Sequence, residues 1–341
     1  MITELVSTAD VAGARAFIER NDLTFESPFD ALIGVHDDGR LIAVGARAGN
    51  VLKMIAVAAS HQGGAVLGEL VTGLVANAYA AGFDALFVFT KPAYLASFAA
   101  LNFSLLANQG RVALLEYGHG LSHWLNRQRD LLRPGSKGAV VMNCNPFTLG
   151  HRYLVDCATA QVDHLYVFIV REERSAFPFA VRLQLAQEAL ADLANVTILD
   201  TGNYLVSSAT FPTYFLKQDD PVARIQMELD ATLFGGKIAP FFGITRRFVG
   251  SEPFCPLTSA YNAALRAALP AHGVELIEIE RKQTASAVIS ASRVRELMAR
   301  TPSAHLSAQL SEYVPASTLA FLVSEASAPI RHQLENDMRT Q

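Results

Sequence analysis

Two short polar motifs in the second half of the sequence combine residue types that can hold phosphate groups. The first is Thr-Leu-Gly-His at residues 148–151, and the second is Ile-Ser-Ala-Ser-Arg-Val-Arg at residues 289–295. Each motif opens a helical pattern, and the free N–H groups and dipole of a helix start favour an anion. The two motifs therefore predict a polyphosphate site.

The first motif brings three groups to the place where one phosphate could lie. Thr148 can donate a hydroxyl hydrogen bond, Gly150 has no Cβ to keep a phosphate from the backbone, and the ring of His151 can point back from the helix. Such groups stabilise charge on a phosphorus centre without covalent chemistry. A structural alternative stays open for this motif alone: Thr148 caps the helix, and His151 is a partly exposed first-turn residue.

The second motif adds hydroxyls and a guanidinium. We expect Ser290 to cap the helix, and Ser292 and Arg295 to share one helical face because they are three residues apart. A first-turn hydroxyl with a guanidinium suits the oxygens of a polyphosphate. A capped surface helix with basic residues is the alternative, but the occurrence of two such motifs in one domain favours the phosphate site for both.

The elements that must position these motifs alternate between strand and helix after a break at residues 134–136. The apolar patterns predict strands at 138–142, 164–170, 196–199, 247–250 and 274–279, and helices at 150–161, 179–193, 222–233, 259–269 and 290–299. This alternation predicts an α/β fold with a doubly wound parallel sheet, which binds ligands at the carboxyl ends of its strands. Both motifs lie at such ends.

The first half of the chain has a different pattern. We expect a hairpin with strands at 30–36 and 41–46, strands at 51–58, 85–90 and 112–116, and helices at 64–81 and 92–101, followed by a connecting helix at 121–133. A length of 341 residues also favours two cores. The predicted division is a domain at 1–125, a linker at 126–136, a domain at 137–325 and a frayed polar tail at 326–341.

The composition limits the classes of partner that the protein is expected to bind. The net charge of −4 is spread along the chain, so no basic stripe predicts nucleic-acid binding. No apolar stretch reaches the roughly 18 residues that cross a bilayer, and the N-terminus does not resemble a signal peptide, so we expect a soluble cytoplasmic protein. The three cysteines form no Cys-x-x-Cys pair, and no metal site is predicted; Cys144 is expected to be a small buried residue.

The motifs Thr-x-Gly-His and Ile-Ser-x-Ser-x-x-Arg resemble the signatures of the nucleotidyltransferase superfamily, whose members attack the α-phosphate of a nucleoside triphosphate and release pyrophosphate. The segments around them resemble citrate lyase ligases, and the resemblance covers essentially the whole chain. The most similar segments are residues 141–154, 209–215, 247–255 and 289–295. The resemblance implies an acid–thiol ligase that uses ATP and Mg²⁺ to activate acetate as acetyl-adenylate. It then acetylates the thiol of the phosphoribosyl-dephospho-coenzyme A arm on the acyl carrier protein of citrate lyase.

This resemblance also implies a role for each site residue. Thr148 and His151 would stabilise charge at the α-phosphate, and Ser292 and Arg295 would hold the β- and γ-phosphates as pyrophosphate leaves. Adenosine would lie near residues 250–252, and Mg²⁺ would be held mainly by phosphates and water. The nucleotide-binding residues would be Met142, Asn143, Asn145, Phe147, Gly150, Gly250, Glu252 and Ser290. Arg171 and Arg174 could reach the phosphates, although a solvated loop is favoured, and Arg182 is a weaker candidate.

The first domain resembles an acetyltransferase fold related to the amine N-acetyltransferases. Its stretch at residues 62–67 keeps Gln62 of the pyrophosphate-binding turn but has Ala65 and Leu67 where the pattern has small residues or glycine. We therefore expect a recognition or docking module rather than an acyl-CoA site. Two other functions remain open for the whole chain: an adenylyltransferase acting on a phosphate acceptor such as phosphopantetheine, and an ATP-sensing scaffold, which intact motifs disfavour.

Overall fold

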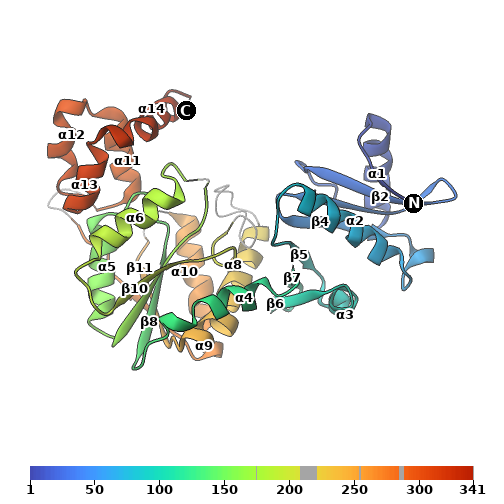
Figure 1. Cartoon of the computed structure of the whole chain (residues 1–341), viewed down its shortest axis with the longest axis horizontal. Coiled ribbons are helices and arrows are strands. Elements are labelled where there is room, and N and C mark those ends of the chain that lie inside the picture. Colours follow the sequence, from blue (N-terminus) through green and yellow to red (C-terminus); the bar gives the residue numbers. More distant parts are fainter. Residues whose placement is uncertain (174, 208–220, 253–254, 284–287, 341) are drawn as a thin grey trace. The chain divides into compact units, whose positions relative to one another are not determined.

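The computed structural model describes residues 1–340 apart from residue 174 and the segments 208–220, 253–254 and 284–287 (Figure 1). The chain divides into two compact units, Met1–His123 and Trp124–Gln341. The division falls inside a helix, α4. Each unit is described by itself below.

Unit 1 is built on a mixed seven-stranded sheet with the order β1-β2-β3-β4-β5-β7-β6. Its only parallel pair is β4 with β5. The strands are β1 Ile2–Glu4, β2 Ala31–Asp37, β3 Arg40–Ala48, β4 Val51–Val57, β5 Phe87–Thr90, β6 Phe103–Gln109 and β7 Val112–Tyr117. The expected hairpin is confirmed: Asp38 and Gly39 both have positive φ, 44° and 73°, as a two-residue turn requires.

Helices cover both faces of this sheet. Helix α2 (Val66–Ala80) buries Leu70 and Leu74 with Ala43 of β3, whereas α1 (Thr8–Arg20) buries Phe17 with Val44, the next residue of the same strand. Successive strand residues point to opposite faces, so the two helices lie on opposite sides. The remaining helices are η1 Ala59–His61, η2 Pro92–Tyr94 and α3 Leu95–Ala99. The mixed sheet with helices on both faces agrees with the α/β class that was expected for this domain.

Two strands and one α-helix of unit 1 were not predicted: β1, β6 and α1. The sequence of β6, Phe-Ser-Leu-Leu-Ala-Asn-Gln, mixes polar and apolar residues because the strand lies at the sheet edge, with Leu105 exposed. The apolar residues of α1 are interspersed with alanine and charged residues, which weakens the periodic signal. The connecting helix α4 (Gly120–Arg127) also ends earlier than predicted, with a separate turn η3 at Arg129–Leu131.

Unit 2 contains a five-stranded sheet with the order β10-β9-β8-β11-β12, parallel throughout. The strands are β8 Lys137–Met142, β9 His164–Ile169, β10 Val196–Asp200, β11 Arg246–Gly250 and β12 Glu275–Ile279. Every residue of β9 is buried, as expected for a central strand with both faces covered. The strand order reverses direction between β8 and β11, which is where doubly wound sheets bind ligands. The predicted fold class is confirmed.

The helices of unit 2 flank this sheet and extend beyond it (Figure 1). Helices α5 and α6 contribute Val155 and Leu185 to the core on the side of Phe248, while Phe234 and Phe242 pack against Phe168 on the other side. The helices are α5 Leu149–Thr159, α6 Phe179–Ala189, α8 Pro221–Leu233, the π-helical η4 Phe234–Ile238, α9 Ala239–Phe242, α10 Pro256–Ala268, η5 Leu269–His272, α11 Ala291–Arg300, α12 Ser303–Leu310, α13 Ala316–Leu322, η6 Glu325–Ser327 and α14 Ala328–Thr340.

The C-terminal segment corrects one prediction. Residues 326–341 were expected to fray, but α14 packs against α11 and buries Ile330 and Leu334 in a cluster with Val294 and Met298. The average polarity of the segment concealed apolar residues four apart, which form one helical stripe. The motif-bearing helix α11 is therefore supported by the end of the chain. Within the described residues, no helix has the length and apolar character that crossing a membrane requires.

Candidate functional site

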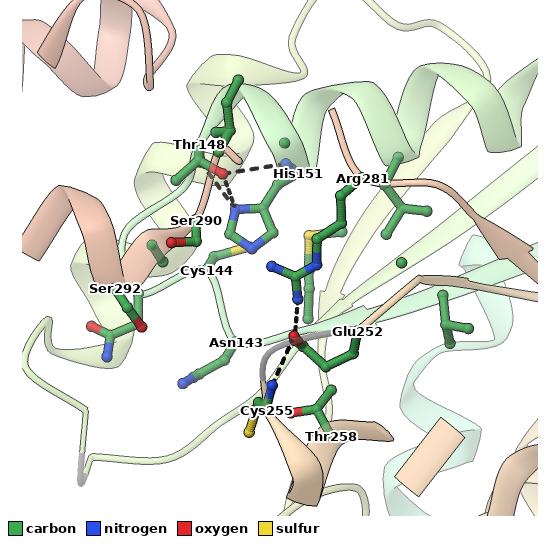
Figure 2. Close-up of a pocket in the computed structure, with 18 of the residues that line it drawn as sticks. Asn143, Cys144, Thr148, His151, Glu252, Cys255, Thr258, Arg281, Ser290 and Ser292 are labelled. Atoms are coloured by element: carbon green, nitrogen blue, oxygen red, sulfur yellow. Dashed lines mark hydrogen bonds and ion pairs between the residues drawn. The ribbon is translucent and has the colours of Figure 1, made fainter. Parts of the chain in front are cut away.

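A cavity of about 780 Å³ opens at the carboxyl edge of the unit 2 sheet (Figure 2). It is lined by the loops after β8, β11 and β12, by the starts of α5 and α11, and by part of α14. The structure brings together nearly all the predicted site residues here. Those that line the cavity are Met142, Asn143, Asn145, Thr148, Gly150, His151, Gly250, Glu252, Ser290, Ser292 and Arg295.

Thr148 and His151 form a reciprocal cap at the start of α5. The Thr148 hydroxyl accepts from the His151 backbone N–H at 3.3 Å, and the Thr148 backbone N–H donates to Nδ1 of His151 at 3.0 Å. Thr148 therefore caps the helix, as one interpretation of the motif predicted. The cap does not exclude a role in phosphate binding, because it is what turns the imidazole back toward the cavity.

The environment of His151 fixes its protonation state. Burial, and secondarily the positive charge of Arg281, lowers its pKa to about 4, so the ring is neutral at pH 7. Nδ1 accepts the Thr148 N–H, which requires the remaining proton to be on Nε2. Phe147, which is fully buried outside the cavity, packs against the ring with centroids 5.4 Å apart. His151 thus offers a neutral N–H donor held in a fixed orientation.

Gly150 allows the two motifs to approach each other. A Cβ at this position would lie 3.2 Å from the carbonyl oxygen of Ile289 and 3.4 Å from the Thr148 hydroxyl, so a larger residue would push the loops apart. In the first turn of α5, Leu149 N–H donates to the Tyr313 carbonyl at 2.8 Å. Among the described residues, the Gly150 N–H has no partner. This donor at the cavity wall suits an anion.

Helix α11 contributes the second half of the site. Ser290 caps it, accepting the Arg293 N–H at 3.2 Å, which confirms the prediction. Arg295 donates to the Ser292 hydroxyl at 3.1 Å and to the carbonyl oxygen of Asn145. Because Asn145 follows β8, Arg295 ties the second motif to the loop of the first. Burial lowers the pKa of Arg295, but the guanidinium stays charged.

Arg182 of α6 holds the loop after β8 through hydrogen bonds. The sequence did not show this supporting role. Its side chain is fully buried, and Nη1 donates to the carbonyl and side-chain oxygens of Asn143 at 2.8 and 2.9 Å and to the Val170 carbonyl at 2.8 Å. Nε donates to the Phe177 carbonyl at 2.9 Å. Arg182 therefore supports the site rather than contacting phosphate, and only its place on α6 hinted at this.

The other residues singled out from the sequence do not contribute to the site in the same way. Cys144 is buried, as expected, although it lines the cavity, and burial raises the pKa of its thiol, which disfavours the nucleophilic thiolate. Arg171 is exposed and does not line the cavity, which agrees with the solvated-loop interpretation, while Arg174 lies outside the described residues. Within the described part of the chain, no three His, Cys, Asp or Glu side chains gather to hold a metal ion.

Three basic residues that line the cavity were missed, and one of them, Arg247 of β11, is buried. Arg281 and Lys282 follow β12 at the carboxyl edge of the sheet, and both line the cavity. The rule that pointed to Arg171 after β9 applies equally to them. Arg281 forms an ion pair with Glu252, and Lys282 lies 5.9 Å from the ring of Tyr153. The site is therefore more basic than the two motifs alone predicted.

Comparison with known proteins gives a consistent result. The model of the citrate lyase ligase C-terminal domain matches residues 137–322. The chain is 39% identical over 314 residues to the [citrate [pro-3S]-lyase] ligase of Escherichia coli (strain K12), covering 90% of this chain and 88% of that protein. It is 40% identical over 319 residues to the Klebsiella pneumoniae protein of the same name, covering 92% of each. A Haemophilus influenzae protein of that name is 38% identical over 320 residues.

Proposed function

The chain belongs to the citrate lyase ligase family, and from this premise we propose that it activates acetate with ATP and acetylates the carrier-protein subunit of citrate lyase. The observation that carries the proposal is the convergence of Thr148, His151, Ser292 and Arg295 on one cavity. These residues supply neutral donors and a cation, which is what a reaction at a phosphate requires.

In the proposed first step, ATP binds with its triphosphate between the starts of α5 and α11. An oxygen of acetate attacks the α-phosphorus, the bond to the pyrophosphate oxygen breaks, and acetyl-adenylate remains. His151 donates Nε2–H to an α-phosphate oxygen, beside the Thr148 hydroxyl and the Gly150 N–H. Ser290, Ser292 and Arg295 hold the departing pyrophosphate. Mg²⁺, held mainly by phosphates and water, would neutralise part of the charge.

In the proposed second step, the thiol of the carrier's phosphoribosyl-dephospho-coenzyme A arm attacks the acetyl carbonyl. A thioester forms, the bond between acetyl and phosphate breaks, and AMP leaves. No nucleophile of the ligase is required, so the buried Cys144 is not involved. The adenosine is proposed to lie near Gly250 and Glu252, whose loop is fixed by a hydrogen bond from Asn262 to the Gly250 carbonyl at 3.0 Å.

Residues 1–125 are proposed to form a docking module for the carrier arm or the lyase, and residues 137–325 the catalytic domain. The start of α2 supports a docking role for the first domain, because it lacks the features of a pyrophosphate site. The Gln62 side chain donates to the Val57 carbonyl at 3.1 Å, the N-cap Ala65 provides no side-chain hydrogen bond, and Glu69 is in the first turn. A carboxylate at this position disfavours a pyrophosphate.

The test of this function follows the acetyl group. The protein is incubated with ATP, acetate and the deacetylated carrier subunit, and the carrier is analysed by mass spectrometry while AMP is quantified. We expect one acetyl group on the prosthetic-group thiol for each AMP formed. A carrier that gains an adenylyl group, or AMP formed without acetylation, would contradict the proposal.

A further inference from the structure

Arg281 is a cation of the cavity lining that the two motifs do not explain. It follows β12 on the loop beside the one that carries Glu252, and it lines the same cavity as Thr148 and His151. Figure 2 shows its guanidinium reaching between the imidazole of His151 and the carboxylate of Glu252. Ser290 and Ser292 lie on the other side of the His151 ring in the same view.

The guanidinium is anchored on one side only. Nε donates to the Ser251 carbonyl at 2.6 Å, the backbone N–H donates to the Ser251 hydroxyl at 3.3 Å, and Nη2 pairs with Glu252. Among the described residues, Nη1 makes no hydrogen bond. A guanidinium fixed through two nitrogens, with a third directed at a cavity, is preorganised to bind an anion.

Glu252 holds this arrangement in place. Its side chain is only 7% exposed, and it also accepts the Cys255 N–H at 3.1 Å at the start of α10. The hydrogen bond from the Cys255 N–H holds the Glu252 carboxylate against the main chain, so the carboxylate can hold the Arg281 guanidinium in one position. In the absence of an anion, the ion pair also compensates the charge of Arg281 inside a partly desolvated cavity.

The position of Arg281 relative to His151 indicates which phosphate of a bound nucleotide it would contact under the proposed function. The charge of Arg281 contributes to the lowered pKa of the His151 imidazole, so the two groups lie within electrostatic range of each other. A neutral imidazole donates one hydrogen bond but carries no charge. Arg281 would supply the positive charge that His151 lacks, on the side away from Ser290 and Ser292.

From these contacts we propose that Arg281 binds the α-phosphate of the nucleotide and that Glu252 is the positioning residue that holds it. This inference rests on the proposed function, because it assumes that His151 faces the α-phosphate. It assigns two of the arginines that line the cavity to different phosphates: Arg295 to the leaving pyrophosphate and Arg281 to the phosphorus that stays on the adenylate.

The test compares AMP with adenosine, which differ only in the α-phosphate. Binding of both to the full chain is measured by calorimetry for the wild type, Arg281→Gln and Arg281→Lys. Losing a charge-assisted contact should weaken AMP binding about ten- to a hundredfold in Arg281→Gln and leave adenosine binding unchanged. Arg281→Lys keeps the charge and should recover part of the affinity.

The matched control is Arg266→Gln. Arg266 also pairs with a glutamate, Glu278 of β12, but that pair is exposed and does not line the cavity. Its removal takes the same charge from the same unit, so AMP and adenosine should bind as they do to the wild type. An AMP affinity in Arg281→Gln equal to that of the wild type would overturn the proposal. So would an equal loss for AMP and adenosine, which would indicate a structural role.

A second readout separates the electrostatic role from folding. The pKa of His151, followed by NMR of the imidazole in the free protein, should rise in Arg281→Gln because a nearby positive charge is removed. It should not change in Arg266→Gln, and an unchanged pKa in Arg281→Gln would contradict the proposed position. These measurements need no acetate. If Arg281→Gln loses AMP binding selectively but the protein does not activate acetate, the proposed function is refuted and the role of Arg281 is not.

Discussion

The two units of this chain each have a helix that starts after a sheet strand, but only one of these starts is equipped for an anion. In unit 2, the first turn of α5 presents Gly150 N–H, Thr148 and His151, and α11 brings Arg295 alongside. In unit 1, α2 starts without a side-chain cap and carries Glu69 in its first turn. Under the proposed function, a helix start becomes a phosphate site through the donors and cations that other segments bring to it.

The largest effect should come from removing the His151 donor. We expect His151→Ala to lower the rate of acetate-dependent pyrophosphate exchange about 10²- to 10³-fold, as for loss of one preorganised donor. The variant also loses a helix cap, so thermal unfolding is measured in parallel. Normal exchange in a folded His151→Ala protein would show that the α5 start is no more catalytic than the α2 start.

The next effect concerns the support beneath the unit 2 site. Arg182→Met removes the buried donor of at least four hydrogen bonds and leaves carbonyl oxygens unsatisfied, which should lower the free energy of unfolding by about 3 kcal/mol. Urea unfolding measures this change. The control is Arg171→Met, because Arg171 is exposed and follows β9; it should change the free energy of unfolding by less than about 0.5 kcal/mol. An equal effect of the two substitutions would contradict the role of Arg182 in supporting the loop after β8.

A smaller effect is expected at the end of the chain. Leu334→Ala removes a buried contact between α14 and the cluster that includes α11, and should lower the free energy of unfolding by about 2 kcal/mol. Gln333→Ala, at the exposed neighbouring position, is the control and should be nearly neutral. Equal stability of Leu334→Ala and the wild type would mean that α14 does not support the site.

The pH dependence of stability offers a further test of His151. Its pKa in the folded protein, about 4, is below the unfolded value of 6.5, so the unfolded state binds more protons between these values. This contribution is complete above pH 6.5 and is lost as the pH falls toward 4. The difference in unfolding free energy between the wild type and His151→Asn should therefore change over this window, measured by urea unfolding. A constant difference would contradict the lowered pKa.

The smallest expected effect concerns unit 1. The full chain is first saturated with ATP, which fills the unit 2 cavity, and is then titrated with acetyl-coenzyme A. We expect no strong binding, because the start of α2 carries Glu69 and no capping side chain. Calorimetry measures this directly. Micromolar affinity under these conditions would show that unit 1 binds acyl-CoA after all.

The sequence predicted the sheet of unit 2 and the place of its site because both are local properties. Continuous apolar runs identify buried parallel strands, and the carboxyl-edge rule then locates the loops. The motif with Thr148 and His151 was found in the loop directly after β8, and the motif with Ser290 and Arg295 was found at the helix start that follows β12 and its loop.

What the sequence did not reveal depends on contacts between distant segments. In the sequence, Arg182 cannot be distinguished from a surface arginine on a helix. Its burial and its hydrogen bond to the Asn143 carbonyl depend on how α6 packs. Arg281 gains its place from the loop after β11, through Ser251 and Glu252. The polar composition of α14 hid its apolar stripe because burial depends on α11, a separate element. Tertiary packing decides the contacts in all three cases, although the carboxyl-edge rule could have indicated Arg281, and the four-residue spacing of Ile330 and Leu334 could have indicated the stripe of α14.

The most direct test of the account is exchange of labelled pyrophosphate into ATP by the full chain without any carrier protein. Acetate, longer carboxylates and phosphopantetheine are offered separately. If the unit 2 cavity forms an acyl-adenylate, acetate alone should support exchange, and Arg295→Gln should abolish most of it. Exchange that depends on phosphopantetheine and not on acetate would contradict the account and identify an adenylyltransferase instead.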